Sequence, residues 1–355
     1  MATRIRFGLI GCGAISQKHV EALKHLECAL LVAVADKDQS RAAAVAARAA
    51  TDWYTDYRFV LDRDDVDAVI IATPSGLHAS MSLEALSCGK HVVVEKPMAM
   101  SLADADRMIE ADDRAGRVLS VVHHNRFNMA SQLLKRAIDE GRLGRLVWGS
   151  ASVKWYRPQE YYDESGWRGT VSMDGGVLLN QAIHHIDLLL WYMGAVADVR
   201  AFRSTLGHKI EAEDTAVAAL RFENGAIGSI DATTCAYPRN LEETITVLGE
   251  CGSVVMGGGK LNNLRAWRIE GESDEEAIHL VQSDQPPKWY GHYKVLEDTV
   301  EAIREQRRPS VDGHEARKAL ELILGIYSCT PIARPLEDGG CQVECPATGQ
   351  GGVQL

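Results

Sequence analysis

A glycine-rich stretch near the N-terminus has the spacing of a phosphate-binding turn. The apolar run from Phe7 to Ile10 leads into Gly11, Gly13 and Ser16, in the pattern G-x-G-x-x-S. Gly11 allows a tight reversal, and Gly13 has no side chain to hold a pyrophosphate away from the N–H groups of the next helix. Ser16 replaces the usual third glycine, but it is small enough for close helix-to-strand packing. The pattern predicts dinucleotide binding, and an ordinary strand-to-helix turn is the alternative.

An acidic residue follows at the distance of a ribose-binding carboxylate. The apolar run from Leu30 to Ala35 ends at Asp36, 20 residues after Ser16. A carboxylate there accepts a hydrogen bond from the ribose 2′-OH and repels a 2′-phosphate, which favours NAD over NADP. Lys37 and Arg41 are cations that could hold such a phosphate, so NADP stays open. A helix-capping role is the alternative for Asp36.

Lys96 is the first candidate for proton chemistry. It follows the apolar run His91–Val94 in the sequence Glu95-Lys96-Pro97. The carboxyl ends of parallel strands face the ligand crevice, so a lysine here can hydrogen-bond an alcohol or alkoxide. A solvated surface lysine is the alternative.

A helix predicted over residues 177–193 carries the second candidate. Asn180, His184 and Asp187 have the spacing i, i+4, i+7 and share one face. We predict that His184 is a general base, because an imidazole ordinarily has a pKa near working pH; a satisfied core histidine is the alternative. His185 points about 100° away and is expected to be structural. Two adjacent helix histidines do not converge on one ion, so we predict no metal.

The surrounding pattern predicts an α/β protein with two domains and a tail. Apolar strands over 67–72, 91–94 and 118–122 alternate with helices over 39–50, 78–88 and 102–115. This alternation predicts a doubly wound parallel sheet, a Rossmann domain over residues 1–123. From residue 146 onward the sequence pattern predicts mostly strands, and Asn224-Gly225 predicts a hairpin turn. We expect an α+β domain over 124–330 with an open-faced, mostly antiparallel sheet, closing helices over 290–305 and 313–329, and a Gly/Pro-rich tail over 331–355.

Composition limits the classes of partner. The chain has 355 residues, 25% of them charged, and a net charge of −11. This acidity argues against nucleic acid and membrane surfaces as partners, so we expect a small-molecule substrate. The absence of a signal-peptide pattern and of a long apolar run predicts a cytoplasmic protein. The open sheet face predicts a homo-oligomer, either a dimer or a tetramer.

Taken together, these segments resemble the Gfo/Idh/MocA oxidoreductases. The matching segments are Gly11–Ile15 with His19, Ala72–Pro74 with His78, Glu95–Pro97, Trp167-Arg168, and Gly175-Gly176 leading to His184 and Asp187. The resemblance implies a Rossmann domain, an open-faced second domain, and NAD-dependent oxidation of a secondary hydroxyl of a sugar or cyclitol. Many members have aspartate where this chain has Asn180. An amide cannot carry a proton, so Lys96 and His184 must share the acid–base work while Asn180 orients the substrate.

Within the family, the chain is most similar to the UDP-N-acetylglucosaminuronate 3-dehydrogenase branch. Arg157-Pro-Gln159, Tyr161-Tyr-Asp163, Trp167-Arg-Gly-Thr170 and Trp289-Tyr-Gly-His-Tyr293 carry this similarity. The expected substrate-binding residues are Lys96, Arg157, Gln159, Tyr161, Asn180, His184, Tyr290 and His292. The expected cofactor-binding residues are Gly11, Gly13, Ala14, Ile15, Asp36, Lys37, Thr73, Pro74, His78, Glu95, Lys96, Asn125, Trp167 and Arg168.

The best interpretation is an NAD-dependent dehydrogenase acting at C3 of a nucleotide sugar such as UDP-N-acetylglucosaminuronate. One arginine, Arg157, suits an acidic group but does not establish uronate recognition. An inositol or free-sugar dehydrogenase remains an alternative, as does a non-catalytic NAD-binding regulator.

Overall fold

The computed structural model describes residues 4–259, 261–283, 286–329, 332–335 and 341–342, the last two short segments by their backbone alone. The chain divides into two units. The first comprises residues 1–124 with 286–317, and the second comprises 125–285 with 318–355. Residues 286–317, which we had expected in the second domain, therefore group with the first. Of the predicted tail, residues 331, 336–340 and 343–355 lie outside the described residues.

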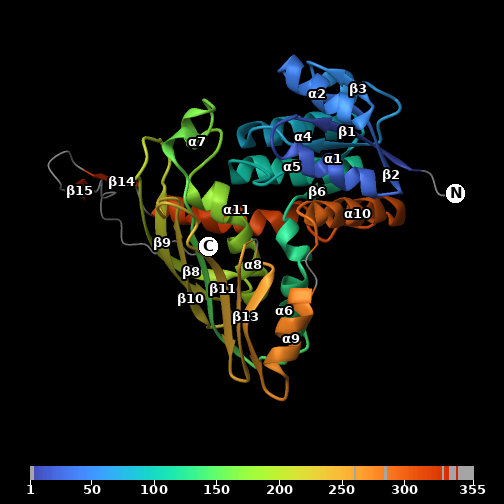
Figure 1. Ribbon diagram of the computed structural model, residues 1–355. Helices are drawn as coiled ribbons and strands as arrows, with labels where there is room; N and C mark the ends of the chain where they lie inside the picture. Colours follow the sequence, from blue (N-terminus) through green and yellow to red (C-terminus); the bar gives the residue numbers. More distant parts are fainter. Residues whose placement is uncertain (1–3, 260, 284–285, 330–331, 336–340, 343–355) are drawn as a thin grey trace. The chain divides into compact units, whose positions relative to one another are not determined.

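The first unit, whose elements from β1 to α5 are blue to teal in Figure 1, is built on a six-stranded parallel sheet. Its strand order is β3-β2-β1-β4-β5-β6. Its strands are β1 (Ile5–Ile10), β2 (Ala29–Ala35), β3 (Asp52–Tyr54), β4 (Ala68–Ile71), β5 (His91–Val94) and β6 (Leu119–Val121). This is the strand order of a Rossmann fold, with its crevice at the carboxyl ends of the strands. The predicted doubly wound parallel sheet is confirmed.

Burial and capping explain these elements. All four residues of β4 have no exposed surface, as a strand covered on both faces requires. The helices of this unit are α1 (Ser16–His25), α2 (Gln39–Ala49), α3 (Arg58–Leu61), α4 (His78–Ser87), α5 (Leu102–Ala115) and α10 (Tyr290–Glu305), with a short 3₁₀ turn, η1, over Ser75–Leu77. Ser101 caps α5 by accepting from the N–H of Asp104, and Gly116 ends it in the left-handed conformation. The predicted helices over 102–115 and 290–305 are confirmed.

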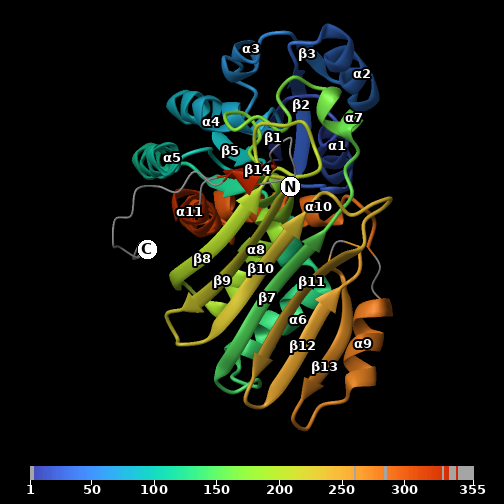
Figure 2. The same ribbon diagram turned by 90° about the vertical axis from the view of Figure 1, so that its left-hand side faces the viewer.

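The second unit is built on a mostly antiparallel sheet, seen face-on in Figure 2. Its main strands, in spatial order, are β13 (Asn263–Ile269), β12 (Gly252–Gly257), β11 (Glu242–Gly249), β7 (Leu146–Lys154), β10 (Ile227–Thr233), β9 (Thr215–Phe222) and β8 (Val196–Ser204). Two short strands, β14 (Ile332–Pro335) and β15 (Cys341–Gln342), extend the order beyond β8. Two pairs are parallel, β7 with β10 and β8 with β14. The predicted Asn224-Gly225 hairpin joins β9 to β10.

Helices pack on one face of this sheet, and the other face is open. The helices of this unit are α6 (Met129–Asp139), α7 (Gln159–Asp163), α8 (Ile183–Met193) and α9 (Asp274–Ser283), preceded at α8 by a π-helix, η3 (Val177–Ala182). A 3₁₀ turn, η2 (His124–Phe127), starts at the unit boundary, and α11 (Gly313–Cys329), predicted from the sequence, spans the other boundary. In β9 the burial alternates strictly, so one face is core and the other solvent.

Candidate functional site

The turn after β1 has the geometry of a phosphate-binding loop. Gly11 has a φ of +97°, and a Cβ on it would lie 2.5 Å from the backbone oxygen of Ala72. A Cβ on Gly13 would meet no atom within 4 Å, so the space above it is open. Ala14 and Ile15 lead into α1, and an isoleucine at the N-cap cannot cap the helix with its own side chain. The first N–H groups of α1 therefore fit an anion such as the pyrophosphate of NAD.

Asp36 is held in a fixed orientation at the end of β2. Its Oδ2 accepts from the N–H of Cys12 at 2.8 Å, and its Oδ1 accepts from the N–H of Asp38 at 2.9 Å. Each oxygen keeps further lone-pair capacity for a ribose hydroxyl. Lys37, beside it, is exposed. The Asp36 carboxylate is thus oriented as a ribose-binding acceptor requires, and the contacts of Asp36 and Lys37 with the adenosine half of NAD stay a prediction.

His78 joins the loops that follow β4 and β5. Its Nδ1 lies 2.8 Å from the carbonyl oxygen of Pro97, and its Nε2 lies 2.9 Å from that of Thr73. Burial lowers the pKa of this imidazole, although both carbonyl contacts oppose the shift. Both ring nitrogens thus face backbone groups. His78 holds the loop of Thr73 and Pro74 in place, and a cofactor contact from that loop stays a prediction.

Glu95 lies in a buried cluster of histidines. Its Oε1 is 2.9 Å from Nε2 of His19 on α1 and 3.4 Å from Nε2 of His292 on α10. The rings of His19 and His124 lie 4.9 Å and 4.7 Å from that of His292. Burial raises the pKa of Glu95, but the hydrogen bonds from His19 and His292 outweigh it, so the net pKa is well below the usual value. The cluster holds Glu95, the residue immediately before Lys96, in place. Lys96 itself is half-buried.

His292 and Tyr290 were expected to bind the substrate, but the structure places both in the first unit, and His292 belongs to the buried cluster. His292 is 1% exposed, and burial lowers its pKa to about 4, so it is a neutral ring engaged inside the first unit. Tyr290 is half-buried and stacks on Tyr293 with ring centroids 6.0 Å apart. Both residues belong to the first unit rather than to the second. Their expected contact with substrate stays a prediction, and for His292 the burial argues against it.

In the second unit, Arg157 is the centre of a cation–aromatic cluster. Its guanidinium lies 5.0 Å from the ring of Trp155 and 5.5 Å from that of Tyr161. Its Nη2 donates to Oε1 of Gln181 at 2.9 Å, and its Nη1 donates to the carbonyl of Tyr156 at 2.7 Å. Gln181 in turn donates to the hydroxyl of Tyr161 at 3.2 Å. A half-buried cation on aromatic faces suits an anionic ligand that also offers a ring for stacking.

Arg168 adds a second cation to this cluster. It lies 4.2 Å from the ring of Tyr161 and 5.5 Å from that of Trp167, and its Nη1 donates to the Tyr161 carbonyl at 3.1 Å. Its buried Nε has no hydrogen-bond partner within the described part of the chain. The same holds for Oδ1 of Asn125, which is 5% exposed. We expected Trp167, Arg168 and Asn125 to contact the cofactor; the two unsatisfied atoms are compatible with a ligand.

Gln159 is used within the protein. Its Oε1 accepts from the N–H of Lys209 at 2.8 Å, and its Nε2 donates to Asp163 at 3.0 Å. The side chain therefore ties α7 to the loop before β9. Its expected contact with substrate stays a prediction.

The segment that carries Asn180 is a π-helix, so the prediction of one continuous α-helix over 177–193 was wrong for its first six residues. Glu213 holds its start, because its carbonyl accepts from the N–H of Val177 at 2.8 Å and its Oε1 from that of Leu178 at 3.1 Å. Asn180 donates its amide to the buried carboxylate of Asp174. The i→i+5 turn is often found at functional sites.

The three helical candidates have different surroundings. His184, on α8, is 9% exposed. His185 is 1% exposed, with Nε2 3.3 Å from the carboxylate of Glu243, in line with its expected structural role. Asp187 forms a buried ion pair with Arg126. His184 is in the second unit and Lys96 in the first, so each unit holds one of the two residues proposed for proton transfer.

Two carboxylates that sequence reasoning missed support this region. Asp174 accepts from the N–H of Gly169 at 2.7 Å as well as from Asn180, and Asp214 accepts from the N–H groups of Leu206 and Gly207 at 2.9 and 2.7 Å. Both are at most 1% exposed. Their spacing does not reveal them, because several of their partners are backbone N–H groups of irregular segments.

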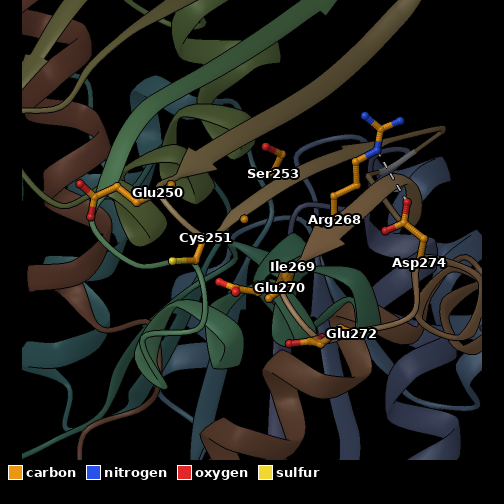
Figure 3. A pocket seen from close by; sticks show the side chains of 10 residues that line it. Glu250, Cys251, Ser253, Arg268, Ile269, Glu270, Glu272 and Asp274 are labelled. Carbon is orange, nitrogen blue, oxygen red and sulfur yellow. Dashed lines mark ion pairs between the residues drawn. The ribbon is translucent and has the colours of Figure 1, made fainter.

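A hollow in the second unit, at the end of the β7–β11 pair away from Lys154, does not contain these residues. It has a volume of about 530 Å³ and lies around the turn after β11 and the end of β13 (Figure 3). Its side chains include Glu250, Glu270, Glu272 and Asp274, with Arg268 paired to Asp274 at 3.8 Å. This acidic, shallow hollow does not suit an anionic ligand.

Two groups of side chains bring possible metal-ligating atoms within 4.8 Å of one another. They are His19, Glu95 and His292 in the first unit, and His208, Asp214 and Cys235 in the second. The absence of a metal therefore stays a prediction. Across the described residues, no helix combines the length and apolar character needed to span a bilayer.

Family models match most of the two units. Residues 5–123 match "Oxidoreductase family, NAD-binding Rossmann fold", and residues 131–255 match "GFO/IDH/MocA C-terminal domain". The 1,5-anhydro-D-fructose reductase of Ensifer adhaerens is 32% identical over 76% of this chain and 81% of its own. The myo-inositol 2-dehydrogenase of Thermotoga maritima is 26% identical over 90% and 94%.

Solved structures give a similar result. The WlbA dehydrogenase from Bordetella pertussis, in complex with NADH and UDP-GlcNAcA, is 41% identical, with a TM-score of 0.84 over 92% of this chain and 96% of that one. The glycine turn, the fixed Asp36 carboxylate and the two matched domains agree with one another. This chain is an NAD-dependent oxidoreductase and belongs to the Gfo/Idh/MocA family.

Proposed function

We propose that the protein oxidises the C3 hydroxyl of a nucleotide sugar, with UDP-N-acetylglucosaminuronate as the best candidate. The observation that carries this proposal is the 41% identity, over nearly the whole chain, to a dehydrogenase whose structure holds NADH and UDP-GlcNAcA. The cluster of Arg157, Arg168 and Tyr161 adds support, because such a ligand is anionic and carries a base that can stack.

The proton chemistry is assigned to two residues. His184 accepts the hydroxyl proton, and Lys96 hydrogen-bonds the developing alkoxide. NAD, held by the Gly11 turn and Asp36, supplies the hydride acceptor. Asn180 orients the sugar, since its amide is fixed by Asp174 and cannot itself transfer a proton.

The experiment is a substrate panel with purified protein and NAD, followed at the NADH absorbance band. UDP-N-acetylglucosaminuronate should be oxidised with a kcat/KM at least about tenfold above UDP-N-acetylglucosamine, which lacks the carboxylate. Turnover of myo-inositol or a free sugar alone would favour the alternative suggested by relatives such as the inositol dehydrogenase. NAD binding without turnover of any sugar would favour a regulator.

The variant Lys96→Met tests the assigned proton chemistry. It should lower kcat by about 10²-fold or more while NADH binding stays within about threefold. Lys24→Met is the matched control, because Lys24 is an exposed residue of α1 paired with Glu21. Unchanged turnover in Lys96→Met would remove this lysine from the mechanism.

We further propose that a second copy of the chain covers the open sheet face of the second unit. Phe202 on β8 is 78% exposed and pairs with Val217 on β9, while Ile227 on β10 is 52% exposed. Contact with a second copy would remove these exposed apolar side chains from water. Sedimentation velocity should give a dimer or tetramer, and Phe202→Asp should shift it toward the monomer. A monomeric wild-type protein would contradict this proposal.

A further inference from the structure

His208, in the loop between β8 and β9, bridges two acceptors inside the second unit. Its Nδ1 lies 3.0 Å from Oδ2 of Asp214, and its Nε2 lies 2.7 Å from the backbone carbonyl oxygen of Arg157. The ring is 6% exposed and packs 4.9 Å from that of Tyr162. A ring that faces an acceptor on each nitrogen can satisfy both only as a doubly protonated imidazolium.

The surroundings favour that charged form. Burial lowers the pKa of His208, but the hydrogen bonds to Asp214, Cys235 and the Arg157 carbonyl raise it to about 10. Asp214 is fully buried and also accepts from the N–H groups of Leu206, Gly207 and His208 itself. Three backbone N–H groups thus hold its carboxylate in addition to the imidazole ring.

With the contact from His208, both the backbone N–H and the backbone carbonyl of Arg157 are hydrogen-bonded. The Arg157 N–H donates to the carbonyl of Thr234 at 2.9 Å, and its own carbonyl accepts from His208. A second tie follows two residues later, where Gln159 accepts from Lys209. The chain that carries the guanidinium is therefore held against the loop 205–210.

We propose that His208 is a positioning residue that orients the Arg157 guanidinium for an anionic group of the substrate. The proposal rests on the nucleotide-sugar function, because only a charged ligand makes the direction of this guanidinium matter. A hydrogen bond donated by a cation to a carbonyl is stronger than one between two neutral groups. A small displacement of a group that orients the substrate has a large effect on the kinetics.

The same three side chains do not form a nucleophilic triad. Sγ of Cys235 lies 3.8 Å from Nδ1 of His208, the nitrogen that already faces Asp214 at 3.0 Å. A triad requires the nucleophile and the acid on opposite ring nitrogens. Here Nε2 is taken by the Arg157 carbonyl, so the arrangement fixes the backbone and does not activate the thiol.

Two isosteric variants separate the two contacts of the ring. The amide nitrogen of His208→Gln takes the place of Nε2 and keeps a donor for the Arg157 carbonyl, while that of His208→Asn takes the place of Nδ1 and loses it. His208→Asn should raise the KM for UDP-N-acetylglucosaminuronate by roughly 10- to 100-fold with kcat changed less than about threefold. His208→Gln should stay within about threefold of wild type. The KM for NAD should not change in either.

The double variant tests the route of the effect. Arg157→Ala alone should raise the same KM. Adding His208→Asn should raise it no further, because both changes remove the same interaction, that of the oriented Arg157 guanidinium with the substrate. A purely structural role would make the two effects multiply. Should His208→Asn melt too low for kinetics, His208→Met replaces it, since it fills the ring's space without a donor and Asp214 keeps its backbone donors.

The outcomes distinguish this inference from the proposed function. A wild-type KM in both donor-free variants, or multiplying effects with Arg157→Ala, would overturn the role of His208 alone. If the wild type oxidises a different sugar, the proposed substrate fails and the same comparison is made with that sugar. A crystal structure of His208→Asn in which Arg157 keeps its contacts to Gln181 and the Tyr156 carbonyl would overturn the inference whatever the substrate.

Discussion

The guanidinium of Arg126 and the carboxylate of Asp187 form a two-pronged ion pair inside the second unit. Nε donates to Oδ2 at 2.8 Å and Nη2 to Oδ1 at 2.7 Å, with side-chain exposures of 6% and 2%. Asp187 shares a helix with His184, so this pair ties α8 to the short turn η2. It explains one member of the polar helix face that the sequence could not assign.

Asp187→Ala should lower the free energy of unfolding by about 3 to 5 kcal/mol, because it removes the carboxylate that accepts from two nitrogens of the buried Arg126 guanidinium. Urea unfolding of the second unit, followed by tryptophan fluorescence, measures the loss. Arg126→Met with Asp187→Leu should recover most of it. The exposed pair of Asp198 and Arg200 is the control, and Asp198→Ala should cost less than about 1 kcal/mol. Equal losses at both pairs would contradict the prediction.

Asp36→Ala should change the cofactor preference. The variant removes the acceptor for a ribose 2′-OH and the repulsion of a 2′-phosphate, and leaves Lys37 and Arg41 beside the site. The kcat/KM should fall about tenfold with NAD and rise about tenfold with NADP. Asp36→Asn keeps an oxygen acceptor and should retain more of the NAD activity. If the ratio of kcat/KM with NAD to kcat/KM with NADP equals that of the wild type, Asp36 does not determine the choice between the two cofactors.

Asp112→Asn should stabilise the first unit at alkaline pH. Burial and the neighbouring charge of Asp113 raise the pKa of Asp112 to about 7, and its buried Oδ1 has no hydrogen-bond partner among the described residues. A raised carboxyl pKa costs stability above pH 7, and the cost disappears as the pH falls toward the unfolded value near 4.

The gain in Asp112→Asn should be about 1 to 2 kcal/mol at pH 8 and clearly smaller at pH 4.5. Thermal melting at both pH values measures it. Asp113→Asn, at a neighbouring carboxylate paired with Arg308 and 51% exposed, should give a smaller change. A gain independent of pH would show that ionisation is not the cause.

The imidazolium of His208 predicts a loss of stability at high pH. Its folded pKa of about 10 lies above the unfolded value near 6.5, so its contribution is complete below pH 6.5 and is lost as the pH rises through 10. Tyr162, which packs against it, has its pKa raised by burial to about 12 and stays neutral in this window. The melting temperatures of wild type and His208→Gln should converge between pH 6.5 and 10, and parallel curves would refute the assignment.

Local patterns predicted the Rossmann half almost residue by residue. The strand at 91–94 and the helix over 102–115 have the predicted bounds, because an apolar run, a cap at Ser101 and a stop at Gly116 lie within a few residues of one another. Gly11 and Asp36 likewise act within one βαβ unit. Local sequence is sufficient where local contacts decide the structure.

Other features depended on distant contacts and could not be predicted. The π-helix at Val177 needs Glu213, 36 residues away, to hold its start. His292 lies within the motif Trp289–Tyr293, whose resemblance suggested substrate contact, but its partner Glu95 is distant in the sequence. β13 and α9 were not predicted, and neither was the parallel pairing of β7 with β10.

That parallel pairing has a consequence for how specificity can be exchanged. Because β7 and β10 run in the same direction, with Trp148 opposite Ile227 and Lys154 opposite Thr233, the chain leaves β7 at one end of the strand pair and enters β10 at the other end. The segment between the two strands contains Arg157, Arg168, Asn180, His184 and His208, and it also supplies β8 and β9 to the same sheet. A graft of this segment onto a relative would therefore carry the residues proposed to bind the substrate together with two strands of the sheet, and its two junctions would lie at opposite ends of the β7–β10 pair.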